Sequence, residues 1–152
     1  TLGGTAPEAP PAAITPAPQT DGPQMAVGER EDFERARAAL DTGNHEEAAR
    51  LFAEHVQTYP GGPLTGEAHF LRGQALDALG RTTEAARAFL EAFSQAPSGP
   101  NAPAALLALG QKLGALGQTQ DACVTLGEVQ ARFPGSDQAA QAGAELSRLG
   151  CG

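Results

Sequence analysis

The sequence is poor in aromatic residues and contains no tryptophan. Of its 152 residues 5% are aromatic and 41% are hydrophobic, so alanine, leucine and glycine must fill most of any core. Long alternations of valine and isoleucine, which half-buried strands would need, are also missing, whereas good helix formers dominate from Glu29 onward. We therefore expect an all-α fold built from closely packed helices.

Clusters of basic residues and long apolar runs are missing as well. The formal net charge is -8, and the 10 basic residues, all at or after Arg30, form no stripe. Nucleic acid and anionic membrane surfaces are therefore not expected as partners, and without a run of about 18 apolar residues no direct membrane insertion is expected. No signal peptide begins at Thr1, so we expect either a cytosolic chain or a mature or truncated product of a longer protein, and the start without methionine favours the second.

Residues 1–28 differ in composition from the rest of the chain. They include six prolines, six alanines and four glycines, with two acidic residues and no basic residue. Such a segment cannot bury enough apolar surface to offset the entropy of ordering it. We predict a disordered Pro/Ala/Gly-rich linker over 1–28, followed by one helical domain over 29–152.

The domain contains five rows of residues that recur at a spacing of 37 residues. Small residues allow two helices to approach, large apolar residues fill the space between them, glycine ends the first helix of each repeat, and proline ends the second. The rows are Ala36, Gly73 and Gly110; Gly43, Gly80 and Gly117; Ala48, Ala85 and Ala122; Phe52, Phe89 and Leu126; and Pro60, Pro97 and Pro134.

These rows predict three helix–turn–helix repeats and a final helix. The repeats are expected at about 29–63, 64–100 and 101–136, and a capping helix at about 137–149 should cover the apolar face of the last repeat. The six repeat helices are expected near 30–42, 45–58, 65–79, 82–95, 102–116 and 119–132.

The order of small, small, aromatic and proline residues resembles the tetratricopeptide repeat (TPR). Two differences from that motif are visible. Arg35 and Arg72 stand where the motif prefers leucine, whereas Leu109 follows it. The period is 37 residues and not 34, and the extra residues fall in the loop after each proline.

These longer loops resemble a more specific family. The stretches Tyr-Pro-Gly-Gly-Pro, Ala-Pro-Ser-Gly-Pro-Asn-Ala-Pro and Arg-Phe-Pro-Gly-Ser, and the third-repeat stretch 117–129, are similar to the C-terminal repeat domain of the CpoB (YbgF) family of Tol–Pal-associated cell division coordinators. The resemblance covers about 29–151. In that family a signal peptide and an oligomerising coiled coil precede the linker and the repeats. Both are missing here, so oligomerisation is expected only through a coiled coil that this chain lacks.

This resemblance implies a non-enzymatic adaptor in the periplasm of a Gram-negative bacterium. Its protein partners would be a TolA-like periplasmic protein and a septal peptidoglycan synthase, and it would coordinate septal peptidoglycan synthesis with outer-membrane constriction during cell division. Two alternatives stay open: another TPR scaffold, such as an outer-membrane assembly or chaperone adaptor, and the regulatory domain of an envelope enzyme. The sequence upstream of Thr1 would separate them.

A partner-binding groove is expected along the first helices, because in TPR arrays these helices line the concave face. We call this predicted set the first-helix stripe. An aromatic and apolar floor with polar flanks suits a helical or extended peptide. The stripe lacks the Lys/Asn set with which TPR co-chaperones hold a C-terminal carboxylate, and the alternative for Phe33 and Phe70 is a place in the core. Its members are Arg30, Phe33, Arg37, Leu40, Phe70, Gln74, Asp77, Leu107 and Gln111.

The two cysteines are the main candidates for covalent chemistry. Antiparallel packing of the last two helices would bring Cys151 beside Cys123, and an oxidising periplasm would permit a disulfide with 27 residues between its cysteines. The alternative is that Cys123 is a small core residue, equivalent to Ala49 and Ala86, and that Cys151 is a free thiol.

No catalytic, cofactor or metal site is expected. His45, His55 and His69 do not pair at a helical ligand spacing, and the sequence contains no phosphate-binding glycine loop or nucleophile motif. The acidic pair Glu46 and Glu47 is interpreted as the favourable negative charge at the start of a helix.

Overall fold

A computed structural model describes residues 25–152, which fold into seven α-helices without a strand. The all-α prediction is confirmed, and each predicted helix end lies within one residue of the observed one. Most of the linker predicted over 1–28 lies outside the described residues. The helices are α1 (Glu29–Asp41), α2 (His45–Thr58), α3 (Thr65–Ala78), α4 (Thr82–Gln95), α5 (Ala102–Ala115), α6 (Thr119–Arg132) and α7 (Asp137–Leu149).

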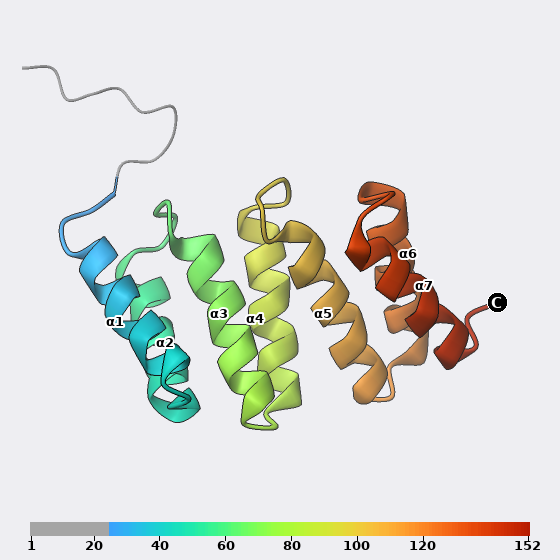
Figure 1. Ribbon diagram of the computed structural model, residues 1–152, viewed down its shortest axis with the longest axis horizontal. Coiled ribbons are helices and arrows are strands. Elements are labelled where there is room, and N and C mark those ends of the chain that lie inside the picture. The colour runs from blue at the N-terminus through green and yellow to red at the C-terminus, as the bar shows by residue number, and fades with distance from the viewer. Residues whose placement is uncertain (1–24) are drawn as a thin grey trace, which may run out of the picture.

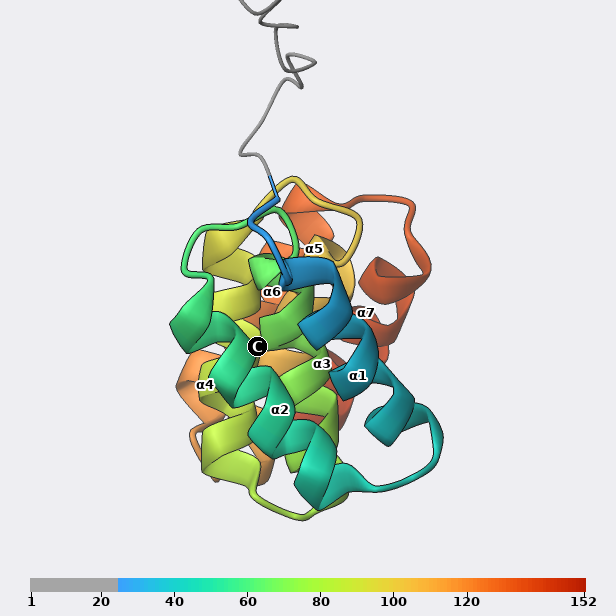
Figure 2. The same ribbon diagram turned by 90° about the vertical axis from the view of Figure 1, so that its left-hand side faces the viewer.

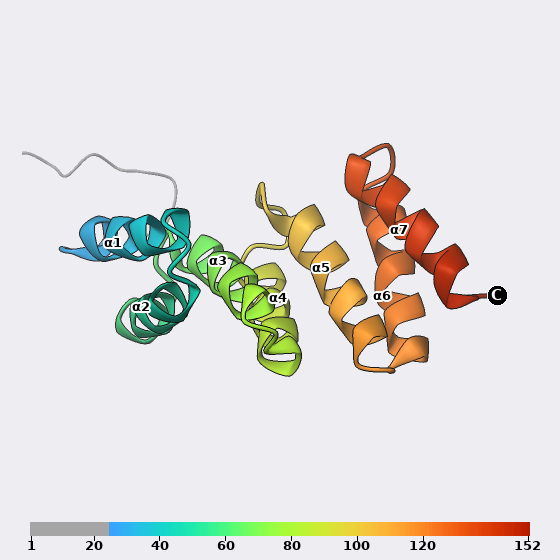
Figure 3. The same ribbon diagram turned by 60° about the horizontal axis from the view of Figure 1, so that its bottom comes forward.

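The helices form a row of hairpins. Each helix packs against the next one along the chain, and α1 also contacts α3, as α5 contacts α7. Figure 1 shows the row running from α1 and α2 at one end to α7 at the other, and Figure 2 views it from the end formed by the first hairpin. In Figure 3, the first helices α1 and α3 lie on one side of the row and the second helices α2 and α4 on the other.

The core follows the repeat. The large residues Phe52, Phe89 and Leu126 are buried, as the spacing predicts. So are the small residues of the rows that begin at Ala36 and Ala48. Glycine is required in two of the repeats, because a Cβ atom added to Gly73 would lie 2.7 Å from the Phe89 ring and one added to Gly110 would lie 2.6 Å from Leu126. The large side chain of each second helix therefore occupies the space that the first helix leaves empty.

The helix ends are also set by the repeat. Gly43, Gly80 and Gly117 follow the first helices with φ of 80°, 75° and 77°, a left-handed conformation that glycine adopts without a steric penalty. The capping helix α7 begins at Ser136, whose side chain accepts the Ala139 N–H at 3.0 Å. None of the helices in residues 25–152 is both long and apolar enough to cross a membrane.

Candidate functional site

The first-helix stripe lies on α1, α3 and α5, and most of its side chains reach the surface. Arg30, Arg37, Gln74 and Asp77 are exposed, and Leu40, Phe70 and Gln111 are partly buried. Phe70 packs beside Phe89, with ring centroids 5.7 Å apart, and keeps part of its side chain accessible. The centre of the stripe therefore combines a partly exposed aromatic ring with an exposed amide.

Two members of the predicted stripe belong to the core instead. Phe33 is 7% exposed and lies edge-on to Phe52, with centroids 5.8 Å apart, and Leu107 is 6% exposed. Alanine and glycine at the helix contacts leave space that these larger side chains fill. A surface role for Phe33 and Leu107 is therefore wrong, whereas the alternative reading of Phe33 as a core residue is correct.

Two of the three charged residues of the stripe, Arg37 and Asp77, are paired with residues on other first helices, whereas Arg30 lies 4.0 Å from Glu34 on its own helix. Arg37 on α1 lies 3.3 Å from Glu67 on α3, and Asp77 on α3 lies 2.6 Å from Lys112 on α5. The periodic pattern did not point to Glu67 or Lys112, because it describes equivalent positions in each repeat and not contacts between repeats. Both pairs neutralise charge where the first helices of consecutive repeats meet.

The first repeat contains a buried carboxylate, Glu29, to which no motif or periodic row of the sequence points. The side chain of Glu29 is fully buried, its Oε1 accepts the Leu64 N–H at 3.2 Å, and its Oε2 accepts the Ala26 N–H at 3.2 Å. Gly62 leaves room for this carboxylate, because a Cβ atom added at Gly62 would come closer to the Glu29 oxygen than van der Waals contact allows. Glu29 therefore joins the segment before α1 to the loop before α3.

His55 lies beside this carboxylate. Its Nε2 is 3.8 Å from Glu29 Oε1, its side chain is fully buried, and neither ring nitrogen has a hydrogen-bond partner among the described residues. The ring packs on Phe33 and Tyr59, with centroids 5.7 Å and 5.0 Å away. Burial lowers the pKa of His55 below its ordinary value of 6.5, against the opposing effect of Glu29. His55 is thus a packed core histidine.

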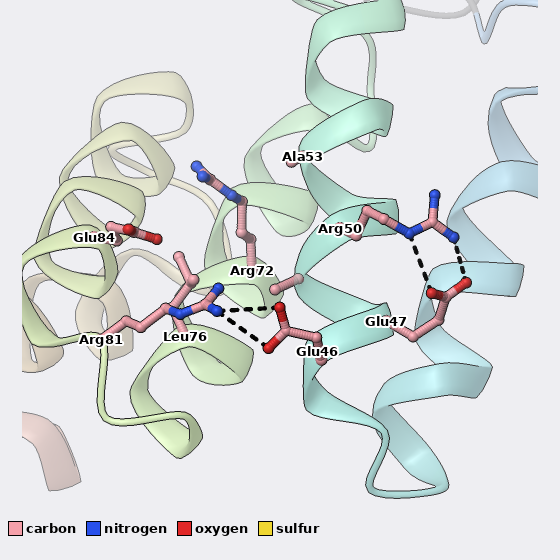
Figure 4. A pocket seen from close by; sticks show the side chains of 9 residues that line it. Glu46, Glu47, Arg50, Ala53, Arg72, Leu76, Arg81 and Glu84 are labelled. Atoms are coloured by element: carbon pink, nitrogen blue, oxygen red, sulfur yellow. Dashed lines mark hydrogen bonds and ion pairs between the residues drawn. The ribbon is translucent and has the colours of Figure 1, made fainter.

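The two arginines that depart from the repeat motif each line a cleft. Arg35 borders a cleft of about 90 Å³ together with Leu51 and Thr58. Arg72 borders a larger cleft of about 260 Å³, which lies between α2, α3 and α4 (Figure 4). At the equivalent position of the third repeat, Leu109 is buried. No residue of the first-helix stripe lines either cleft.

The last two helices are joined by the two cysteines. The structure links Cys123 on α6 to Cys151 after α7 in a disulfide, with Cα atoms 5.7 Å apart. The residues that the structure describes contain no group of three His, Cys, Asp or Glu side chains placed to hold a metal ion.

Sequence comparison places the repeats in a known family. The family model for the tetratricopeptide repeat matches the chain over residues 33–103 and again over 70–137, which together cover more than half of it. The chain belongs to the tetratricopeptide repeat family. Members of this family are in general scaffolds for protein interactions and not catalysts. No curated protein matches the sequence of this TPR chain.

Solved structures share the TPR fold at low sequence identity. The TPR2B domain of yeast Sti1 in a pHsp70 complex has a TM-score of 0.66 at 16% identity, covering 82% of this chain and 98% of that one. The second TPR domain of human RPAP3, in complex with the HSP70 peptide SGPTIEEVD, has a TM-score of 0.65 at 20% identity, covering 84% and 96%. The first TPR of Spaghetti (RPAP3), bound to the HSP90 peptide SRMEEVD, has a TM-score of 0.67 at 15% identity, covering 86% and 96%.

Proposed function

We propose that this chain is a non-enzymatic adaptor that binds a segment of another protein along the first-helix stripe. The observation that supports this most is the centre of the stripe, where the partly exposed Phe70 lies on the same helix as the exposed Gln74. An aromatic anchor with a nearby amide can bind both apolar side chains and the backbone of a peptide. Leu40 on α1 and Gln111 on α5 extend this surface to the neighbouring repeats.

The paired charges of the stripe favour a partner segment without an acidic cluster. The similar structures include TPR domains bound to peptides with two glutamates and an aspartate. In this chain an acidic peptide would have to displace Glu67 from Arg37 and Asp77 from Lys112, which lie 3.3 Å and 2.6 Å apart. We therefore expect a segment that presents mainly apolar and uncharged side chains, and the chaperone-adaptor alternative is disfavoured.

The biological setting that we propose is the bacterial envelope. The loops after Pro60, Pro97 and Pro134 and the stretch 117–129 resemble the Tol–Pal-associated cell division coordinators. The disulfide between Cys123 and Cys151 is compatible with an oxidising compartment such as the periplasm. The expected partners are then a TolA-like periplasmic protein and a septal peptidoglycan synthase, and the role is coordination of septal wall synthesis with outer-membrane constriction.

Binding of the purified partners tests this proposal. A TolA-like protein and a septal synthase should each be titrated against the wild-type chain and against Phe70→Ala and Arg37→Glu. We expect weaker binding of at least one partner to both variants, with unchanged helix content by circular dichroism. Arg87→Glu is the control, because Arg87 is exposed on the second helix α4 and also reverses one charge. Equal binding by all four chains would remove the stripe as the site, and no binding by any of them would remove these partners.

A further inference from the structure

Arg72 is a half-buried arginine that the fold leaves without a partner. Leu109, at the equivalent position of the third repeat, is 8% exposed and part of the core. The Nε of Arg72 is buried without a hydrogen-bond partner, and its guanidinium forms no ion pair with any described residue. A guanidinium has five N–H donors, and donors that stay unpaired away from water are unfavourable. The buried Nε–H of Arg72 is therefore unsatisfied as the chain stands alone, and its terminal nitrogens have no partner among the described residues.

The cleft around Arg72 has an apolar floor and a charged rim, on which Arg81 and Arg50 are paired with glutamates and Glu84 is not paired with any described residue. Ala49, Ala53 and Leu76 contribute the apolar lining. On the rim, Arg81 Nη2 lies 3.1 Å from Glu46 Oε1, and Arg50 Nε donates to Glu47 Oε2 at 3.1 Å (Figure 4). Figure 4 also shows the Arg72 side chain rising between α2 and α4 without such a pair.

We propose that this cleft binds one carboxylate group carried on a short aliphatic stem, with Arg72 as its anchor. The planar guanidinium matches the two oxygens of a carboxylate, and the apolar lining suits the carbon atoms that bear it. The lining contains three glutamates, Glu46, Glu47 and Glu84, so a dianion such as phosphate would meet more repulsion than a monoanion.

This site is separate from the proposed stripe. Its rim residues lie on the second helices α2 and α4 and in the turn before α4. Arg72 and Leu76 lie on the first helix α3, but no residue of the stripe lines the cleft. An acidic side chain of a protein and the C-terminus of a chain both carry the required group. A partner could thus be held at the stripe by apolar contacts while an acidic residue enters the cleft.

The arginine Nε–Hε resonances of the full 152-residue chain provide a direct test. The probes are N-acetyl-glutamate α-amide for a side-chain carboxylate, N-acetyl-leucine for a terminal carboxylate, N-acetyl-glutamine α-amide as the neutral match, and inorganic phosphate as the dianion. The Arg72 signal is identified by its absence in Arg72→Leu, which introduces the residue found at Leu109. We expect a saturable shift of this signal with at least one carboxylate probe, about tenfold tighter than with the neutral amide.

Variants distinguish binding in the cleft from nonspecific attraction between the probes and positive charges on the surface. Arg87→Leu removes one exposed arginine charge from α4 outside the cleft lining and should leave the Arg72 response unchanged. Arg72→Lys, which keeps the charge without the planar fork, should lose the tight response, as judged by the backbone amides of Ala49 and Leu76. Equal responses to the carboxylate and amide probes, or a stronger response to phosphate, would overturn the proposal. So would a loss of the carboxylate-induced shifts of the Ala49 and Leu76 amides in Arg87→Leu that is as large as the loss in Arg72→Leu.

Discussion

Replacing Glu29 with alanine should destabilise the first repeat, although Glu29 is the first residue of the first helix. The fully buried carboxylate accepts the Leu64 N–H and the Ala26 N–H, each at 3.2 Å. Ala26 is exposed, so water can replace the lost acceptor there, whereas Leu64 is partly buried. Leaving one buried N–H unpaired costs about 1–3 kcal/mol. We expect the local free energy of opening around Leu64 to fall by that amount.

Amide hydrogen exchange measures this local stability. A loss of about 1–3 kcal/mol corresponds to exchange of the Leu64 amide that is about 5 to 150 times faster. Glu31→Ala is the matched control, because Glu31 is exposed in the same helical turn and pairs with no described residue. Its effect should stay within about 0.5 kcal/mol. If Glu29→Ala and Glu31→Ala change the Leu64 exchange rate equally, the structural role given to the buried carboxylate is wrong.

Three further predictions concern packing, the disulfide and pH. Gly110→Ala should have a free energy of unfolding, measured by urea denaturation, about 1–3 kcal/mol lower than that of Gly127→Ala. A Cβ atom added at Gly110 would lie 2.6 Å from Leu126, whereas one added at Gly127 would have no neighbour within 4 Å. Equal stabilities of the two variants would contradict the close contact. Cys151→Ser should lower stability by about 3–4 kcal/mol under oxidising conditions and change nothing under reducing ones, and two reactive thiols in the unfolded, unreduced wild type would contradict the disulfide. Burial lowers the pKa of His55 from 6.5, so the unfolded chain binds that proton first as the pH falls. Stability should therefore decline between about pH 7 and pH 5, and His55→Phe should reduce that slope in thermal melts; an unchanged slope would exclude His55 as a cause.

The repeated part of the fold could be predicted from the sequence because its determinants are local and periodic. Glycine at Gly43, Gly80 and Gly117 and proline 17 residues later determine where helices end, whatever surrounds them. Three equivalent copies of each row then support one another. The close approach of helices at Gly73 and Gly110 could be predicted for the same reason, whereas their contacts with Phe89 and Leu126 appear in the structure.

The parts that the sequence did not reveal depend on contacts between repeats. Periodicity shows that Phe33 and Leu107 are apolar and on first helices, but whether they face the core or the groove depends on how far neighbouring helices turn relative to one another. The Leu64 N–H that donates to Glu29 and the Glu67 carboxylate that pairs with Arg37 come from the next repeat, 35 and 30 residues away, and no motif relates such positions. The departure of Arg72 from the motif was visible in the sequence, but the cleft beside it appears only in the packed structure.

Photo-crosslinking from Gln74 tests most directly whether the first-helix stripe binds a partner. A photoreactive amino acid at Gln74, which is exposed at the centre of the stripe, is compared with the same amino acid at Arg87 on the second helix α4. Each chain is mixed with the purified TolA-like protein and with the purified septal synthase, and then irradiated. We predict a crosslinked product with at least one of them from position 74 and little or none from position 87. Products that form equally from both positions, or only from position 87, would contradict the stripe as the binding surface.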